Sequence, residues 1–117
     1  IDLILRRFIP MQSIRNFINR RYELFKLPQD QPFLIPNLSG CFLLIKTELF
    51  IKIGGFDEKY FMYMEDVDIC KRIREKGGVI LATPKLIVIH NAQRASRRNL
   101  KHLRWHIISI FRYFTGL

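Results

Sequence analysis

The sequence predicts an α/β fold in which short strands carry packed helices, and three observations predict it. Residues 38–45, 79–82 and 86–89 are apolar runs with the length of buried strands. Residues 47–53, 65–76 and 99–114 instead space their apolar side chains as helices do. The first two of these helices end at paired glycines, which adopt the left-handed conformation at low cost. The pairs are Gly54-Gly55 and Gly77-Gly78.

We expect residues 1–27 to form a separate basic helical segment and residues 28–117 to form the rest of the domain. Helical spacing from residue 3 to residue 26 is interrupted by Pro10, so we expect two short helices. Three prolines then hold the chain extended, as a connector or an active-site loop. They are Pro28, Pro32 and Pro36.

Two residues receive specific structural roles. Gly40, inside the predicted strand 38–45, permits close approach of a ligand or of another backbone segment. Thr47 has the side chain of a helix N-cap.

The composition bounds the class of protein. At 117 residues the chain is one domain or a piece of one, and because it begins at Ile1 we expect residues before it. Twenty Lys and Arg against ten Asp and Glu give a net charge of +10, which predicts an anionic partner: nucleic acid, a phosphorylated substrate or an acidic membrane surface. No apolar run reaches the length of a membrane span. Cys41 and Cys70 lack metal or redox spacing, so we expect buried thiols in a reducing compartment.

Three carboxylates, Glu65, Asp66 and Asp68, lie at the start of the helix predicted over 65–76. The helix dipole alone would stabilise each of them by about 0.3–1 kcal/mol, so the presence of the cluster does not by itself indicate a functional site. At 100° per residue, Asp66 shares the apolar face of the helix, whereas Asp68 points toward solvent as a capping or surface charge. A carboxylate on a core-facing stripe is costly unless it is used, which favours Asp66 as a general base. Glu65 lies at the edge of that face and can accept hydrogen bonds from substrate hydroxyls.

Four motifs in this order and spacing resemble the acceptor-side, C-terminal half of bacterial family 2 glycosyltransferases, and above all their rhamnosyltransferase-like members. The motifs are Leu38 to Ile45, Gly54-Gly55-Phe56-Asp57-Glu58, Phe61-Met62-Tyr63-Met64-Glu65-Asp66-Val67-Asp68 and Val88-Ile89-His90. The resemblance covers residues 36–115 and does not extend to residues 1–26.

The resemblance implies a GT-A fold and transfer of a sugar, with inversion, from a nucleotide-sugar donor to a carbohydrate or lipid-linked acceptor in surface polysaccharide biosynthesis. Asp66 would be the catalytic base. A divalent metal, Mn²⁺ or Mg²⁺, would be bound mainly by an N-terminal half that this chain lacks, with His90 completing the metal shell. In the resembling enzymes a loop at the position of Arg94, Ser96 and Arg97 closes over the donor diphosphate, and these side chains suit phosphate. A chain without its donor half should be inactive alone.

The helix predicted over residues 99–114 is amphipathic and basic. It suits either an anionic membrane surface, on the inner face of the plasma membrane of a cytoplasmic enzyme, or a core position with a basic outer face. His102 and His106 have metal-ligand spacing, but no third ligand is near, so we expect solvated or interfacial side chains. Folding through self-association, as a homo-oligomer, is a further expectation.

Two other functions remain open at this stage: a basic nucleic-acid-binding module and a membrane-peripheral fragment without catalytic activity. The first does not explain an inward-pointing Asp66, and nucleic acid is not the expected partner. In the second, Glu65 and Asp66 would only cap a helix. Replacement of Asp66 by Asn distinguishes them, because it should abolish sugar transfer only in an enzyme.

Overall fold

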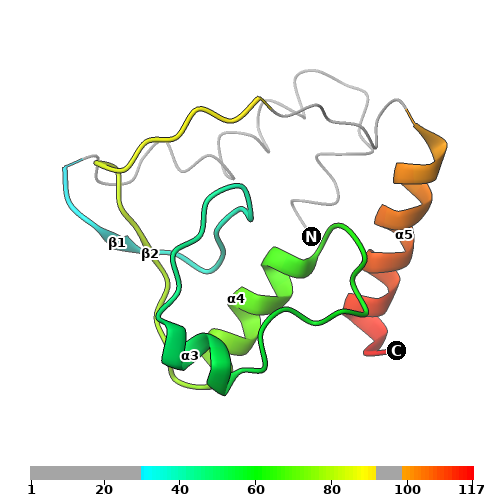
Figure 1. Cartoon of the computed structure of the whole chain (residues 1–117), viewed down its shortest axis with the longest axis horizontal. Coiled ribbons are helices and arrows are strands. Elements are labelled where there is room, and N and C mark those ends of the chain that lie inside the picture. The colour runs from blue at the N-terminus through cyan, green and yellow to red at the C-terminus, as the bar shows by residue number, and fades with distance from the viewer. Residues whose placement is uncertain (1–29, 92–98) are drawn as a thin grey trace.

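A computed structural model describes residues 30–91 and 99–117 (Figure 1). Its described elements, in chain order, are β1 (Phe33–Leu34), α3 (Thr47–Lys52), α4 (Glu65–Glu75), β2 (Leu81–Ala82) and α5 (Leu100–Thr115). This mixture of short strands and packed helices confirms the α/β prediction at that level. The predicted helices of residues 1–27 lie outside the described residues.

The described sheet is a single antiparallel pair, with Phe33 opposite Ala82 and Leu34 opposite Leu81. The Ile35 N–H extends the ladder by donating to the Ile80 carbonyl at 3.0 Å. The proline-flanked stretch is therefore extended, as predicted, and it also pairs with the chain that leaves α4.

The core lies between this sheet and α4. Its buried members are Ile35, Ile69, Cys70, Ile73 and Ile80, and side chains of α3 and of residues 38–45 pack against them. Cys70 is 1% exposed, so its thiol is buried as predicted, and burial raises its pKa. Cys41 is exposed, which corrects the prediction for that thiol.

The helices α3 and α4 confirm the predicted ones within a residue or two, and both end in left-handed glycines. Gly54 has φ +77° and Gly77 has φ +78°. The N-cap of α3 is Lys46 rather than Thr47, and no side chain caps that end.

The predicted strand over residues 38–45 is wrong, because this segment pairs with a helix instead of a sheet. Its first part runs along α4 and makes contacts at Arg74, Cys70 and Asp66. Arg74 donates to the Pro36 carbonyl, Leu38 N–H donates to Cys70 Sγ at 3.5 Å, and Gly40 N–H donates to Asp66 Oδ2 at 2.9 Å. Two residues of an extended chain and one turn of a helix both span about 6 Å. A contact therefore recurs at every second residue of the extended segment and at every turn of α4. Gly40 then enters a turn and is exposed rather than buried.

The predicted strand over residues 86–89 is also wrong. The segment has no strand partner among the described residues, and its side chains are exposed; Ile87 is 85% and Ile89 101% exposed. A strand needs a hydrogen-bonding neighbour, and this run meets none in that part of the chain.

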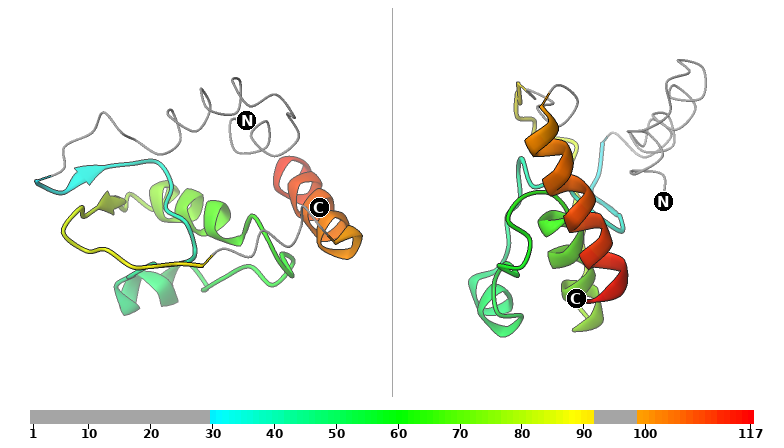
Figure 2. Two further views of the ribbon diagram at one scale, coloured as in Figure 1. Left: turned by 90° about the horizontal axis from the view of Figure 1, so that it is seen from above. Right: turned by 90° about the vertical axis from the view of Figure 1, so that its right-hand side faces the viewer.

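Helix α5 lies beside the N-terminal end of α4, and residues 53–64 run between the two helices (Figures 1 and 2). The Asn99 side chain caps it by accepting from the Lys101 N–H at 2.8 Å. In the described part of the chain no helix is long and apolar enough to cross a membrane.

Candidate active site at the start of helix α4

The turn that leads into α4 contains two consecutive left-handed residues that are not glycine. Tyr63 has φ +69° and Met64 has φ +68°, and Met64 is the N-cap of α4. Such conformations cost about 1–3 kcal/mol each and persist only where surrounding contacts fix them. Strain of this kind clusters at functional sites, and here it directly precedes Glu65 and Asp66.

Helix α5 supplies the contacts that fix this turn. The Tyr63 hydroxyl lies 3.1 Å from His102 Nδ1, and the Tyr63 ring stacks on His106 with a centroid distance of 4.5 Å. Ser109, 3% exposed, donates from Oγ to the Met62 carbonyl at 2.8 Å. His102 and His106 are thus interfacial, as predicted.

Backbone N–H groups hold the Asp66 carboxylate from two sides. Gly40 N–H donates to Oδ2 at 2.9 Å, and Val67 N–H donates to Oδ1 at 2.8 Å. Each carboxylate oxygen retains a free lone pair, and the side chain is only half-buried. The predicted inward placement of Asp66 is therefore only partly right: the carboxylate is oriented by the protein and still open to a substrate.

Gly40 leaves room for this contact, because a side chain at position 40 would crowd Asp66. A Cβ on residue 40 would lie 3.2 Å from Asp66 Cβ and 3.6 Å from Asp66 Oδ2. The group that approaches Gly40 is therefore the Asp66 side chain, not the ligand or backbone segment that the sequence predicts.

Glu65 is the neighbouring acid, and its environment differs from that of Asp66. Its Oε2 is buried without a hydrogen-bond partner among the described residues. Burial raises the pKa of the Glu65 carboxyl, a bond from its own backbone N–H opposes the rise, and the Asp66 charge adds to it. Glu65 is thus an unpaired acceptor beside Asp66, which suits the predicted contact with a substrate hydroxyl.

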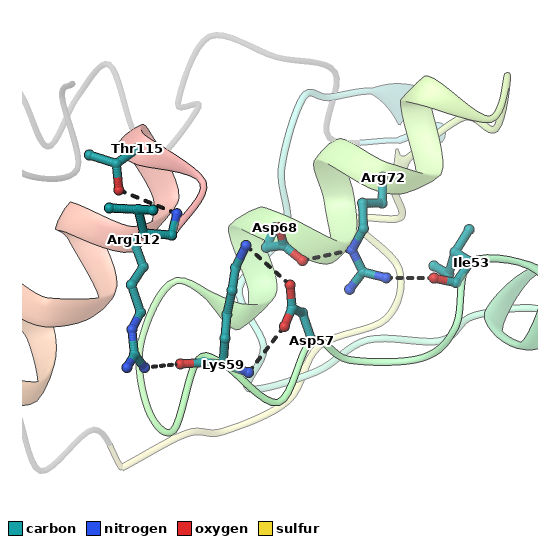
Figure 3. Close-up of polar contacts among 8 residues, drawn as sticks. Ile53, Asp57, Lys59, Asp68, Arg72, Arg112 and Thr115 are labelled. Atoms are coloured by element: carbon teal, nitrogen blue, oxygen red, sulfur yellow. Dashed lines mark hydrogen bonds and ion pairs between the residues drawn. The ribbon is translucent and has the colours of Figure 1, made fainter.

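Asp68 is not the surface charge that the sequence predicts, since it is 7% exposed. Its Oδ2 accepts from Arg72 Nε at 2.7 Å, and Arg72 Nη1 donates to the Ile53 carbonyl at 2.7 Å (Figure 3). The helical wheel assumed one buried face, but residues 53–60 cover the other face of α4. Tyr60 in that segment is 6% exposed, and burial, then the nearby Asp68 charge, raises its pKa.

The covering segment is itself cross-linked. Asp57 accepts from Lys59 N–H at 3.0 Å and pairs with Lys59 Nζ at 3.3 Å, while Arg112 of α5 donates to the Lys59 carbonyl (Figure 3). This network fixes the path of residues 57–60 between α4 and α5.

An aromatic pair, of which Phe61 is exposed, joins the loop before α4 to α5. Phe61 is 69% exposed, and its ring centroid lies 4.8 Å from that of Trp105. Lys101 Nζ lies 5.1 Å from the Trp105 centroid. Sequence reasoning missed this pair and the Tyr63–His102 contact; helical spacing of His102, Trp105, His106 and Ser109 on one face was the signal available for both.

The remaining predicted site residues are not brought to α4 by the described structure. His90 is exposed, and the described residues contain no group of three His, Cys, Asp or Glu that could hold a metal ion. A metal role for His90 stays a prediction. Arg94, Ser96 and Arg97 lie outside the described residues, and their phosphate contacts stay predictions too.

Residues 25–103 match a protein-family model described as the N-terminal domain of galactosyltransferase. The match covers more than half of the chain. The chain belongs to this glycosyltransferase family.

Curated relatives of this glycosyltransferase chain agree with that assignment. It is 35% identical over 92 residues to rhamnosyltransferase WbbL of Escherichia coli strain K12, covering 75% of this chain and 35% of that protein. It is 39% identical over 80 residues to the N-acetylglucosaminyl-diphospho-decaprenol L-rhamnosyltransferase of Mycobacterium tuberculosis strain H37Rv, covering 68% of this chain and 25% of that protein. The predicted resemblance to rhamnosyltransferase-like glycosyltransferases is confirmed.

The chain therefore spans about a third or less of the length of these relatives. No solved structure matches it. Which part of a longer enzyme the chain forms stays a prediction.

Proposed function

We propose that this chain forms the acceptor side of an inverting glycosyltransferase of GT-A fold, with Asp66 as the general base. The observation that carries the proposal is the Asp66 carboxylate, held by two backbone N–H groups next to a strained turn yet still half exposed. Family membership favours this reaction over a nucleic-acid-binding module or a non-catalytic membrane fragment.

The reaction is a single displacement. Asp66 takes the proton of an acceptor hydroxyl within about 2.6–3.2 Å, as that oxygen bonds to the anomeric carbon of the donor sugar. The bond from the anomeric carbon to the donor phosphate oxygen breaks, and the nucleoside diphosphate leaves with the electron pair. Attack opposite the leaving group inverts the anomeric centre.

The acceptor is a sugar carried on a diphospho-lipid, and the transferred sugar is rhamnose. The activity for which the mycobacterial relative is named supports both assignments. In this chain, Glu65 accepts a hydrogen bond from an acceptor hydroxyl through its unpaired Oε2. The exposed ring of Phe61, beside Trp105, packs on the apolar face of the acceptor sugar.

The nucleotide-sugar donor binds mainly outside the described residues. The GT-A fold implies Mn²⁺ or Mg²⁺ held largely by an N-terminal half, with His90 as an added ligand and Arg94, Ser96 and Arg97 on the donor diphosphate. Among the described residues His90 stands without the further ligands of a metal site, so these residues do not form one by themselves. Such a donor places the reaction on the cytoplasmic side of the plasma membrane.

The proposal is tested with the complete enzyme that contains this chain, a panel of nucleotide sugars and a diphospho-lipid-linked acceptor sugar. We expect transfer from a nucleotide-rhamnose donor and a product whose anomeric configuration, read by NMR coupling constants, is opposite to that of the donor. Retention of configuration would contradict the single displacement. Transfer of another sugar would exclude rhamnose as the transferred sugar but leave the proposed role of Asp66 intact.

A further inference from the structure

Helix α5 has two faces of opposite character, and the structure uses the less apolar one for packing. The residues that contact the loop before α4 are His102, Trp105, His106, Ser109 and Arg112. At 100° per residue these five side chains lie on one side of the helix.

The opposite side, which we call the outward face, carries the apolar stripe of the helix. It consists of Leu100, Leu103, Arg104, Ile107, Ile110, Phe111 and Phe114. Four of these are large exposed apolar side chains: Leu100 at 84%, Ile107 at 51%, Phe111 at 58% and Phe114 at 61%. The sequence left open whether this helix is a core helix. The contacts of its other face show that its apolar stripe is turned away from the described core.

The charge of α5 has a single sign. Its sixteen residues contain Lys101, Arg104 and Arg112 and no Asp or Glu. Arg104 lies within the apolar stripe and is exposed, whereas Lys101 is exposed on the flank of the helix beside Trp105. The whole chain carries a net charge of +10. An apolar stripe that contains an exposed Arg, on a helix without acids, complements a surface that is anionic outside and apolar beneath.

We propose that the outward face of α5 docks on the surface of an anionic phospholipid bilayer, with the helix lying in the plane of the membrane. Helices of this type bury their apolar face by about 5–10 Å while their cations contact lipid headgroups. Because the opposite face of α5 contacts residues 59–63, docking would hold the turn before Glu65 and Asp66 at the membrane. The bilayer docking itself does not depend on the proposed sugar transfer.

The test is co-sedimentation of the chain with vesicles of phosphatidylglycerol and phosphatidylcholine, compared with vesicles of phosphatidylcholine alone. We expect binding to the anionic vesicles that weakens as salt is added. The double variant Ile107→Ser, Phe111→Ser should lower the partition coefficient by about tenfold or more, because two exposed apolar side chains leave the lipid contact. Circular dichroism should stay unchanged, since neither side chain is buried in the described core.

The matched control is Ile51→Ser, Leu86→Ser, which removes two exposed apolar side chains outside α5. It should bind as the unaltered chain does. Failure of the unaltered chain to bind anionic vesicles overturns the proposal, as does equal binding by the α5 double variant. A dimer in solution that the α5 variant dissociates, without vesicle binding, would instead assign the outward face to a second copy of the chain.

Discussion

The backbone N–H of Gly40 lies 2.9 Å from Oδ2 of Asp66, so a residue in a turn orients a carboxylate on a helix 26 positions further along the chain. The contact is tight: a Cβ at residue 40 would come within 3.2 Å of Asp66 Cβ. We therefore expect Gly40→Ala to displace the carboxylate by a few tenths of an ångström while the chain still folds. Sugar transfer by the complete enzyme should lose about tenfold in kcat, since reacting groups tolerate little misplacement.

Ser39→Ala is the control for Gly40→Ala, because it adds no atom near Asp66. It should leave kcat unchanged. A Gly40→Ala enzyme with normal kcat and normal stability would show that the Gly40 contact does not position the base.

The Asp68–Arg72 pair should contribute to stability more than to catalysis. Asp68→Asn removes the charge that Arg72 Nε contacts at 2.7 Å inside the layer formed by residues 53–60. We expect a loss of about 1–3 kcal/mol in the free energy of unfolding, because Arg72 stays largely buried with a weakened partner. Urea unfolding of the chain measures it.

The matched change is Glu75→Gln, which breaks the exposed Lys71–Glu75 pair on the same helix, 3.9 Å apart. Its cost should stay below about 0.5 kcal/mol. Equal effects of the two substitutions would mean that the Asp68 pair is no stronger than a surface ion pair.

Local sequence signals predicted the helices well, because apolar spacing and terminal glycines act within a few residues. Asp68 shows where they fail: a helical wheel cannot tell that residues 53–60 fold over the second face of α4. Residues 38–45 fail for a related reason, since an apolar run fits a strand or an extended segment on a helix equally well. The Gly40–Asp66 contact joins both regions, and only the three-dimensional structure shows it.

Glu65 should make stability depend on pH in a defined direction. Burial raises its pKa above 4.5, so the folded chain holds this proton more tightly than the unfolded chain does. The contribution of Glu65 to stability should therefore be greatest below pH 4.5 and fall as the pH rises through the folded-state pKa. Glu65→Gln should lessen that fall.

The measurement is the urea midpoint of the chain and the Glu65→Gln variant at about pH 4 and about pH 7. Glu48→Gln, at an exposed carboxylate of α3, is the control and should change nothing. The urea midpoints of the Glu65→Gln variant and the unaltered chain could differ by the same amount at both pH values. That result would show that Glu65 ionises equally in the folded and unfolded states.

Phe61 should act on acceptor binding and not on folding. Its ring is 69% exposed and packs against the ring of Trp105. We expect Phe61→Ala to raise the KM for the acceptor sugar by about fivefold to tenfold, through loss of an aromatic contact of about 1 kcal/mol, with kcat nearly unchanged.

Two comparisons make the Phe61 measurement specific. Phe61→Tyr keeps the ring and should restore the acceptor KM, while Ile51→Ala removes an exposed apolar side chain on α3 and should leave it unchanged. If Phe61→Ala lowers the unfolding midpoint and leaves the acceptor KM alone, the ring serves only to pack against Trp105.

The central claim, that Asp66 is the base, is tested most directly by Asp66→Asn in the complete enzyme, assayed for sugar transfer beside Glu58→Gln, which alters an exposed acid of the preceding loop. Asn keeps the size of the side chain and can still accept the Gly40 N–H, but it cannot take a proton. The account predicts a fall in kcat of about 10²- to 10⁴-fold for Asp66→Asn and none for Glu58→Gln. Transfer by a folded Asp66→Asn enzyme at the unaltered rate would contradict it.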